Sequence, residues 1–224
     1  MTANTVILAV ELGAEHADQL GVLRALWAAV ADGGGMPLAA APAGRVGCLE
    51  PGTVAAGILL ARFPTAAAAR SAYATRLGAV LAQALPPGTV PTVLVAEALP
   101  DGGLPDLLDI PTTASVPRAP DPARHCFLLV RGRAWDQPRL DRYRDVILPM
   151  HKERGGYYEC FAVAPGQVVA LAGEWREEIL AVSRWPTRAA ADDFWYSERY
   201  QRVAIPLRLG AGRFTVHQVA AGVP

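Results

Sequence analysis

A motif that occurs twice constrains this chain more than any other feature. Residues 62–65 (RFPT) recur as residues 184–187 (RWPT), and each copy leads into an alanine-rich stretch. A glycine run precedes both copies, and its last glycine lies 27 residues before the first arginine and 28 before the second. Glu50 and Glu174 are a weaker match between the halves. Matching segments that occur in the same order and at nearly the same spacing indicate an internal duplication. Such a duplication predicts that the two halves fold alike.

Both halves predict the same succession of elements. Short apolar runs of strand length alternate with stretches of helical composition. Glycines after the first helix of each half suit a helix C-terminus, and Thr65 and Thr187 suit the N-cap of the second helix. The expected strands are 5–10, 37–41, 57–63 and 92–96, then 125–130, 157–163, 179–185 and 213–219, and the expected helices are 15–31, 65–85, 136–154 and 187–196. The order is βαββαβ, twice.

We therefore predict an α+β chain of two ferredoxin-like βαββαβ repeats. Residues 1–99 form a diverged first repeat, residues 100–124 a linker with six prolines, and residues 125–224 the second repeat. Because proline fixes φ and removes a hydrogen-bond donor, we expect an extended linker with a short docked turn at 104–110. The two helices of each repeat cover only one face of its sheet. The bare faces are expected to pack on each other, which gives an intramolecular dimeric α/β barrel.

Alternation along the strands predicts which side chains meet between the sheets. In the strand that opens the second half, one row is wholly apolar (Cys126, Leu128 and Val130) and should lie under the helices. The other row, with the matching row of the last strand, mixes aromatic, basic and polar groups: His125, Phe127, Leu129, Arg131, Arg213, Thr215 and His217. A mixed and aromatic face is typical of an interface that encloses a ligand cavity.

Charge and composition exclude several classes of partner. Lys plus Arg and Asp plus Glu are 21 each, so the chain lacks the basic field that binding to nucleic acid or to an anionic membrane needs. The longest apolar stretch, 54–61, is far too short to cross a bilayer. Cys48, Cys126 and Cys160 have no CxxC spacing and are interpreted as small buried hydrophobes in a reducing cytoplasm. We expect a cytoplasmic protein that binds a small molecule.

Motifs give no reason to expect a cofactor or a metal ion. The chain has no GxGxxG before a helix, no GxxxxGK[ST], no HExxH, no GxSxG and no Cys/His cluster with zinc spacing. Haem stays open, because one histidine on an inner face would suffice as its ligand. We therefore expect chemistry without a cofactor.

The second half resembles the family called domain of unknown function 1330, in the dimeric α/β-barrel superfamily. The resemblance covers about residues 126–219, whereas the first half shares only its glycines, Glu50 and residues 63–65. The matching residues are Tyr143, Pro149, Gly155, Gly156, the Gly173-Glu174-Trp175 turn, the Trp185-Pro186-Thr187 motif, residues 196–201 (YSERYQ) and Arg208. The resemblance implies two such units that meet sheet to sheet, usually as a homodimer, so we expect a pseudo-dimeric monomer or a homodimer. The superfamily includes cofactor-free monooxygenases, isomerases, polyketide cyclases, haem enzymes and non-catalytic binders, so the fold does not give the function.

Chemically useful side chains concentrate in the second half. It holds three of the four histidines, five of the six tyrosines and four of the five tryptophans. His125 and His217 lie on the same expected face of neighbouring strands, where two imidazoles within reach of each other suit proton transfer near pH 7. The alternative is a pair of partly exposed histidines at a sheet corner.

Glu174 is a further candidate acid or base. It lies in a turn beside Trp175, and an apolar neighbour of this kind raises a carboxylate pKa. Since Glu50 matches it in the first half, a structural role such as capping of backbone amides is the alternative.

Glu159 is expected to point inward. It alternates with Tyr157 on the second strand of its repeat, so both face the other sheet. A buried unpaired carboxylate is costly, so an inward Glu159 needs a partner such as Arg131 or Arg184.

The segment after the last helix is the most typical of the family. Its candidate residues are Ser197, Tyr200, Gln201 and Arg208. Tyr200 and Arg208 suit an anionic or carbonyl-bearing ligand, since arginine offers a bidentate fork. The alternative is that Tyr200 packs in the core and Arg208 pairs with Glu198 or Asp193. His151, near the end of a basic helix, is interpreted as a favourable charge at a helix C-terminus.

We predict a cofactor-independent acid–base enzyme of cyclase, isomerase or lyase type, acting on a small metabolite in bacterial biosynthesis. Its pocket is expected mainly in the second repeat. The expected catalytic residues are His217, His125, Glu174 and Tyr200, and the expected substrate-binding residues are Tyr157, Glu159, Arg184, Trp175, Ser197 and Arg208. The alternatives are a non-catalytic small-molecule-binding or assembly module and a cofactor-free monooxygenase.

Overall fold

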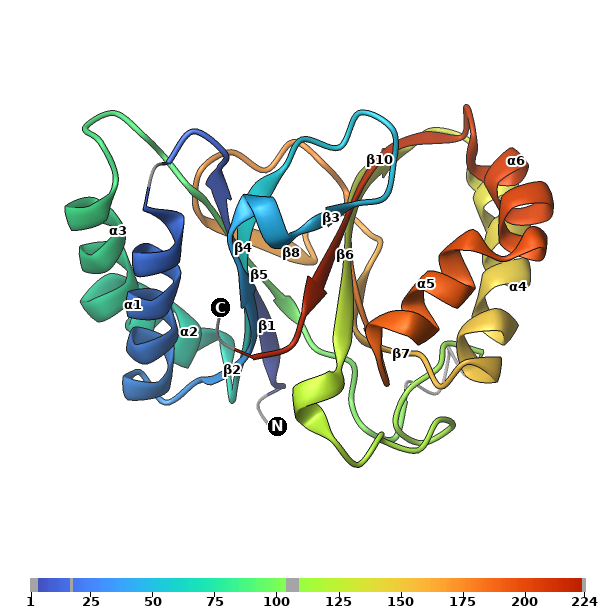
Figure 1. The fold of residues 1–224 in the computed structure, drawn as a ribbon, viewed down its shortest axis with the longest axis horizontal. Coiled ribbons are helices and arrows are strands. Elements are labelled where there is room, and N and C mark those ends of the chain that lie inside the picture. Colours follow the sequence, from blue (N-terminus) through green and yellow to red (C-terminus); the bar gives the residue numbers. More distant parts are fainter. Residues whose placement is uncertain (1–3, 17, 104–108, 223–224) are drawn as a thin grey trace.

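Two antiparallel sheets face each other at the centre of the molecule, and helices cover their outer faces (Figure 1). The computed structural model describes residues 4–16, 18–103 and 109–222. The α+β class and the two antiparallel sheets are confirmed.

The two sheets are built from the two halves of the chain. The strand order is β2-β4-β1-β5-β8 in the first sheet and β3-β10-β6-β9-β7 in the second. The N-terminal half supplies β1 (Val6–Gly13), β2 (Met36–Ala41), β4 (Ala56–Phe63) and β5 (Thr92–Glu97). The C-terminal half supplies β6 (Cys126–Ala134), β7 (Tyr157–Ala162), β9 (Ile179–Trp185) and β10 (Gly212–Ala220). These four strands follow the same order in both sheets.

Each sheet has its own helix layer (Figure 1). The first is covered by α1 (Gln19–Asp32), α2 (Ala66–Ala72) and α3 (Gly78–Ala84), and the second by α4 (Gln137–Glu153), α5 (Arg188–Tyr196) and α6 (Ile205–Arg208). Thr65 and Thr187 are the N-caps of α2 and α5, and each hydroxyl accepts a backbone N–H at 2.9 and 3.1 Å respectively, which confirms the expected caps. Short 3₁₀ turns occur at 43–45 and 122–124, and π-helical turns at 73–77 and 200–204.

Each sheet is completed by a strand from the other half. β8 (Val168–Ala172) follows β7 in the chain but pairs with β5 at the edge of the first sheet. β3 (Gly47–Cys48) pairs with β10 in the second sheet. Neither strand is expected from the sequence, because one is two residues long and both pairings join distant segments. Backbone hydrogen bonds therefore hold the two halves together at two sheet edges.

Apolar side chains fill the space between the sheets. Phe127 and Leu129 point into it and Cys126 and Leu128 lie under the helices, as strand alternation predicts. Buried residues from both sheets join them, including Ile7, Ala9, Leu38, Ile58, Leu60, Leu94, Leu180 and Val182. These side chains close the centre of the interface, so the expected inter-sheet cavity is found only at one end of it, where Arg131, Thr215 and His217 border a pocket of about 360 Å³.

Strand pairing identifies corresponding positions in the two sheets. β1 and β6 begin opposite Phe63 and Trp185, the aromatic residues of the repeated motif. Counting along both strands from these pairs places Glu11 and Arg131 at the same position. The two side chains form an ion pair with each other, with Nη1 and Oε1 2.8 Å apart.

The connector between the halves packs on the C-terminal half where it is described. Ile110, Thr112 and Val116 are buried, and the Tyr158 N–H donates to the Pro111 carbonyl at 2.8 Å. Most of the turn expected at 104–110 lies outside the described residues.

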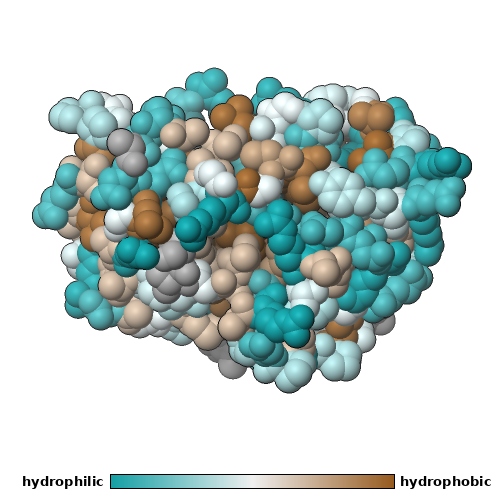
Figure 2. Space-filling view, viewed as in Figure 1, coloured by the Kyte–Doolittle hydropathy of each residue, from teal (hydrophilic) through white to brown (hydrophobic). Residues whose placement is uncertain are grey.

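The surface and the cysteines differ in part from expectation. Cys126 and Cys160 are buried, but Cys48 is exposed on β3, so its interpretation as a buried hydrophobe is wrong. Figure 2 shows hydrophilic residues gathered over the helices of the second sheet. Within the described ranges, no helix has both the length and the apolar character to cross a membrane.

Candidate functional site

The expected pair of histidines does not form. His125 directly precedes β6, whereas His217, on the neighbouring β10, lies opposite Leu129, four residues along the chain from His125. At about 3.3 Å per residue this separation is about 13 Å, which is beyond contact between two imidazole rings. The interpretation of these residues as one proton-transfer pair is wrong, and each ring belongs to a different cluster.

Glu174 lies apart from the other candidates. Its side chain is 72% exposed and pairs with Arg176, so the apolar environment expected for this carboxylate is not found. Trp175 instead packs, half-buried, against the core between the sheets. The acid–base role predicted for Glu174 depended on that environment and loses its physical basis.

Glu159 forms a buried ion pair with two arginines. A β-bulge in β7 turns the carboxylate toward the other sheet, where it is 1% exposed. Arg184 Nε lies 2.6 Å from one carboxylate oxygen, and Arg62 of the first sheet pairs with the other. Arg184 is one of the two partners expected from the sequence; the other, Arg131, pairs with Glu11 instead.

Aromatic rings pack against this cluster. The Arg184 guanidinium lies 5.1 Å from the ring centre of Phe127 and 5.9 Å from that of Tyr157. Burial, with Arg184 nearby, lowers the pKa of His125. Since both guanidiniums already pair with one carboxylate, Glu159 and Arg184 form a structural ion-pair cluster, with Tyr157 packed beside it, in place of the substrate contacts that were expected there.

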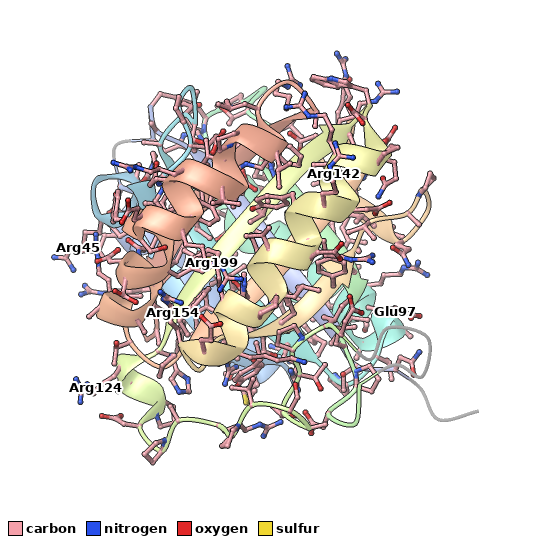
Figure 3. The ribbon with its side chains drawn as sticks, turned by 90° about the vertical axis from the view of Figure 1, so that its right-hand side faces the viewer. Arg45, Glu97, Arg124, Arg142, Arg154 and Arg199 are labelled. Atoms are coloured by element: carbon pink, nitrogen blue, oxygen red, sulfur yellow. The ribbon has the colours of Figure 1, made fainter. Side chains whose placement is uncertain are left out.

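A cavity of about 130 Å³ lies on the opposite face of the second sheet, under α4 and the α5–α6 segment. Figure 3 looks onto these helices, which lie side by side across the strands, with Arg154 and Arg199 where they meet. Apolar side chains form most of the wall, among them Leu128, Leu140, Ile147, Ala181, Phe194 and Phe214. A few polar groups share it: Tyr143, His151, Ser183, Tyr200 and Arg208. Apolar walls with few convergent polar groups are the usual form of a small-molecule site.

Tyr143, Tyr200 and Arg208 make the polar end of this cavity. The two hydroxyl oxygens are 3.1 Å apart, and burial raises the pKa of Tyr200 well above its ordinary value. The Arg208 guanidinium is buried over the rings of Tyr143, Trp195 and Phe214, at 5.3–5.6 Å from their centres. Tyr200 is therefore a neutral hydrogen-bond donor at ordinary pH.

The counter-ion of Arg208 comes from the other half of the chain. Glu50, in the loop between β3 and β4, pairs with Arg208. Burial raises the pKa of Glu50, and Arg208 opposes that rise. Of the alternative expected from the sequence, the packing of Tyr200 in the core is confirmed. The expected pairing of Arg208 is wrong, since Asp193 pairs with Arg154 and Glu198 with Arg202.

His151 belongs to the same cavity, and its interpretation as a favourable charge at a helix C-terminus is wrong. Its ring is buried against Tyr158, Trp185 and Phe194, with centroids 4.5–4.8 Å away. Nδ1 lies 2.8 Å from the Ile147 carbonyl, which accepts, so in the neutral ring Nε2 carries the lone pair. Burial lowers the pKa of His151 to about 4, so the ring is neutral at pH 7. The three-and-four spacing 140, 143, 147, 151 is the signal that places it on the buried helix face.

Ser197 and Gln201 support the helix layer. The Ser197 hydroxyl donates to the Phe194 carbonyl at 2.8 Å and accepts the Tyr200 N–H at 3.2 Å. The Gln201 side chain donates to the Trp195 carbonyl at 2.6 Å. Both residues thus position Trp195 and Tyr200 beside the cavity, and the substrate contact expected for Ser197 is replaced by this internal role.

The described residues do not fit a haem. The cavity that His151 borders is close to the size that holds a benzene molecule, far smaller than a tetrapyrrole. His217 borders a pocket of about 360 Å³ between the sheets, but its Nε2 is already used in a hydrogen bond with the Val54 carbonyl at 2.9 Å. In the part of the chain that the structure describes, no cluster of three or more His, Cys, Asp or Glu is arranged to hold a metal ion.

Comparison with protein families supports the resemblance of the second half. Residues 126–221 match the family model described as Domain of unknown function (DUF1330). Comparison with curated protein sequences finds no match.

Comparison with solved structures covers nearly the whole chain. A proposed monooxygenase of Fusobacterium nucleatum subsp. nucleatum is 8% identical with a TM-score of 0.57, over 99% of this chain and 94% of that one. A mutant chlorite dismutase of Candidatus Nitrospira defluvii is 9% identical with a TM-score of 0.55, over 99% and 93%. A dye-decolorizing protein of V. cholerae is 12% identical with a TM-score of 0.50, over 99% and 94%. At such low identity the likeness shows the fold alone, which is chlorite dismutase-like.

Proposed function

We propose, from the DUF1330 match of residues 126–221, that this half carries an acid–base enzyme site for a small molecule. Every residue that lines the cavity under α4–α6 falls within the matched region. The observation that carries the proposal is the convergence on this cavity of a neutral imidazole, a hydrogen-bonded tyrosine pair and a buried guanidinium. These groups belong to His151, Tyr143, Tyr200 and Arg208.

Cavity size and lining define the substrate class. A volume of about 130 Å³ is close to the roughly 150 Å³ that accommodates benzene. The aromatic wall suits a planar ring, and the polar end suits one oxygen on that ring. The expected substrate is therefore a single-ring ketone or phenol, or the ring end of a larger molecule.

His151 is suited to accept a proton from such a substrate. The Ile147 carbonyl holds the Nδ1 proton, so Nε2 is the nitrogen that takes the new one. A group with a pKa of about 4 is a weak base, so the proton must be activated by a neighbouring carbonyl or aromatic ring. The bonding electrons pass to the substrate oxygen, where the Tyr200 hydroxyl and the charge of Arg208 stabilise them.

A second candidate is a non-catalytic binder with the same cavity. The ion pair between Arg208 and Glu50 favours it, because the guanidinium already has a counter-ion before any ligand binds. For the enzyme, return of the proton at another atom gives an isomerase-type reaction, and transfer of electrons to O₂ gives a cofactor-free oxygenation. The comparisons support none of the lyase, isomerase and cyclase classes.

Phenol and 2-cyclohexenone are probes of the right size. We expect both to bind saturably in ligand-observed NMR, and we expect the protein to speed exchange of the cyclohexenone C–H protons in D₂O. Tyr200→Phe should weaken binding by about five-fold through loss of one hydrogen bond. His151→Phe should abolish the exchange without abolishing phenol binding.

Tyr196→Phe is the matched control, since Tyr196 lies on α5 and is 65% exposed. It should change neither binding nor exchange. If the probes bind but the protein neither speeds C–H exchange nor takes up O₂, the non-catalytic binder is the function that the data support. Equal phenol affinity in the wild type and in Tyr200→Phe would refute the site itself.

We also infer that the two halves are copies of one ferredoxin-like βαββαβ unit, at residues 1–99 and 125–224, joined by residues 100–124. The common strand order and the repeated motif at the ends of β4 and β9 support this inference. The capping threonines that start α2 and α5 support it as well.

A further inference from the structure

A second pocket lies at one end of the interface between the sheets. Its volume is about 360 Å³, and β1, β6 and β10 border it together with the loops before β4 and β5. The face of the second sheet that it touches is opposite to the one that carries the cavity under α4–α6. The two sites therefore share no lining residue.

Two buried groups in this pocket have unmet hydrogen-bonding capacity. His217 is 2% exposed, and its Nε2 lies 2.9 Å from the Val54 carbonyl. A carbonyl accepts, so Nε2 carries the proton and Nδ1 carries a lone pair. Nδ1 and the Thr215 hydroxyl have no hydrogen-bond partner within the described part of the chain. A buried group of this kind is costly unless something else satisfies it.

The charges in the pocket are unbalanced toward the negative. One cation, Arg131, lies between two carboxylates, 2.8 Å from Glu11 and 3.2 Å from Glu177. Burial raises the pKa of Glu11, against the opposing influence of Arg131 and His217. At the rim, His16 lies only loosely against Glu15, at 3.9 Å. Among the described residues that line the pocket, Arg131 is the only arginine or lysine, so the pocket offers acceptors for a further positive charge.

Two valines on the rim add an apolar surface. Val54 is 75% exposed and Val90 is 67% exposed, and both line the pocket. They provide apolar contact area at the mouth of the pocket, beside the polar groups inside it.

We propose that this pocket binds a small primary amine. The ammonium group donates to His217 Nδ1, to the Thr215 hydroxyl oxygen and to the Glu11 carboxylate, and the short apolar body of the ligand covers Val54 and Val90. Three acceptors match the three N–H donors of an ammonium group, whose charge also balances the second carboxylate. This inference goes beyond the proposed function, because it concerns a different ligand on a different face.

The test compares three ligands of one length: n-butylamine, 1-butanol and butyrate, titrated at pH 7.5 by calorimetry. We expect saturable binding of n-butylamine, at least about ten-fold weaker binding of 1-butanol, and none of butyrate. The ten-fold difference reflects the greater strength of a charge-assisted hydrogen bond. Equal affinity for the amine and the alcohol would overturn the proposal.

Two variants locate the binding. Thr215→Val keeps the side-chain shape and should weaken n-butylamine binding by about five-fold, through loss of one acceptor. Thr75→Val, on the surface of the first half, is the matched control and should have no effect. His217→Leu should abolish binding, and leucine suits the position because Leu94 occupies the corresponding place on β5. Unchanged affinity in Thr215→Val refutes the assignment, even where His217→Leu fails to fold.

Discussion

Replacing Glu159 with leucine should destabilise the protein more than replacing either arginine that it binds. The carboxylate is 1% exposed, and the side chains of Arg62 and Arg184 are 20% and 13% exposed. Without Glu159, two largely buried guanidiniums face each other with no counter-charge. Removing one partner of a buried ion pair typically costs about 3–5 kcal/mol, and two stranded cations place this variant at the upper end.

Leucine separates the electrostatic effect from packing. The bulge that holds Glu159 in β7 has a counterpart in β2, where Leu38 lies buried in the same core. A leucine side chain therefore suits this backbone geometry. The loss of stability in Glu159→Leu should arise from the stranded charges and not from a cavity.

Removing one arginine has a smaller effect, because one carboxylate and one guanidinium remain. We expect Arg62→Met to lower the free energy of unfolding by about 1.5–3 kcal/mol, the loss of one charged hydrogen bond. The triple variant Glu159→Leu, Arg62→Met, Arg184→Met should approach the wild type, since an apolar replacement of a buried ion cluster is often neutral.

Urea unfolding followed by circular dichroism measures all three variants. A typical domain is stable by about 5–15 kcal/mol, so a loss of 3–5 kcal/mol is readily resolved from the transition midpoint. The reasoning is refuted if Arg62→Met is as unstable as Glu159→Leu. It is equally refuted if the triple variant is no more stable than Glu159→Leu.

Three further predictions concern titration, ion pairing and thiol reactivity. As the pH falls from 6.5 to about 4, His151 takes up a proton in the unfolded chain but not in the folded one, so the free energy of unfolding should decrease by up to about 3 kcal/mol. Urea unfolding at a series of pH values measures this decrease, and in His151→Phe this part of the pH dependence should vanish. Glu50→Gln leaves the buried Arg208 without a counter-ion and should lower the free energy of unfolding by about 3 kcal/mol. Adding Arg208→Met should restore part of this loss, and a double variant less stable than Glu50→Gln would contradict the prediction. Burial raises the pKa of the Cys126 and Cys160 thiols to about 12, so at pH 8 only the exposed Cys48 should react quickly with a thiol reagent. Cys48→Ser should remove this fast reaction, and a second fast-reacting thiol in the wild type would contradict the prediction.

Local sequence signals were enough to predict the main elements of the fold. The Pro-Thr pairs lie at the starts of α2 and α5, where each threonine is the cap. Alternation along β6 predicted which side chains lie under the helices and which lie between the sheets. β3 and β8 could not be predicted, because their partners belong to the opposite half and no local pattern encodes that pairing.

The candidate site was harder to predict, because it depends on register and on contacts between the halves. Four residues of register separate His125 from His217, although both occupy the expected face. Glu50 reaches Arg208 across 158 positions of sequence, which no spacing rule indicates. The basic sequence neighbours of His151 suggest a charge at a helix C-terminus, but the residue lies on the buried face of α4.

The ion pair between Glu11 and Arg131 has a consequence for how such a protein can be assembled. These residues occupy the same position of β1 and β6, and yet they carry opposite charges and touch. In a homodimer built from one kind of subunit, an isologous contact on the two-fold axis sets each residue against its own copy, glutamate on glutamate or arginine on arginine. Where each half has its own sequence, the two residues at this contact can differ. Linking the halves thus makes attraction available at a place where symmetry would impose repulsion.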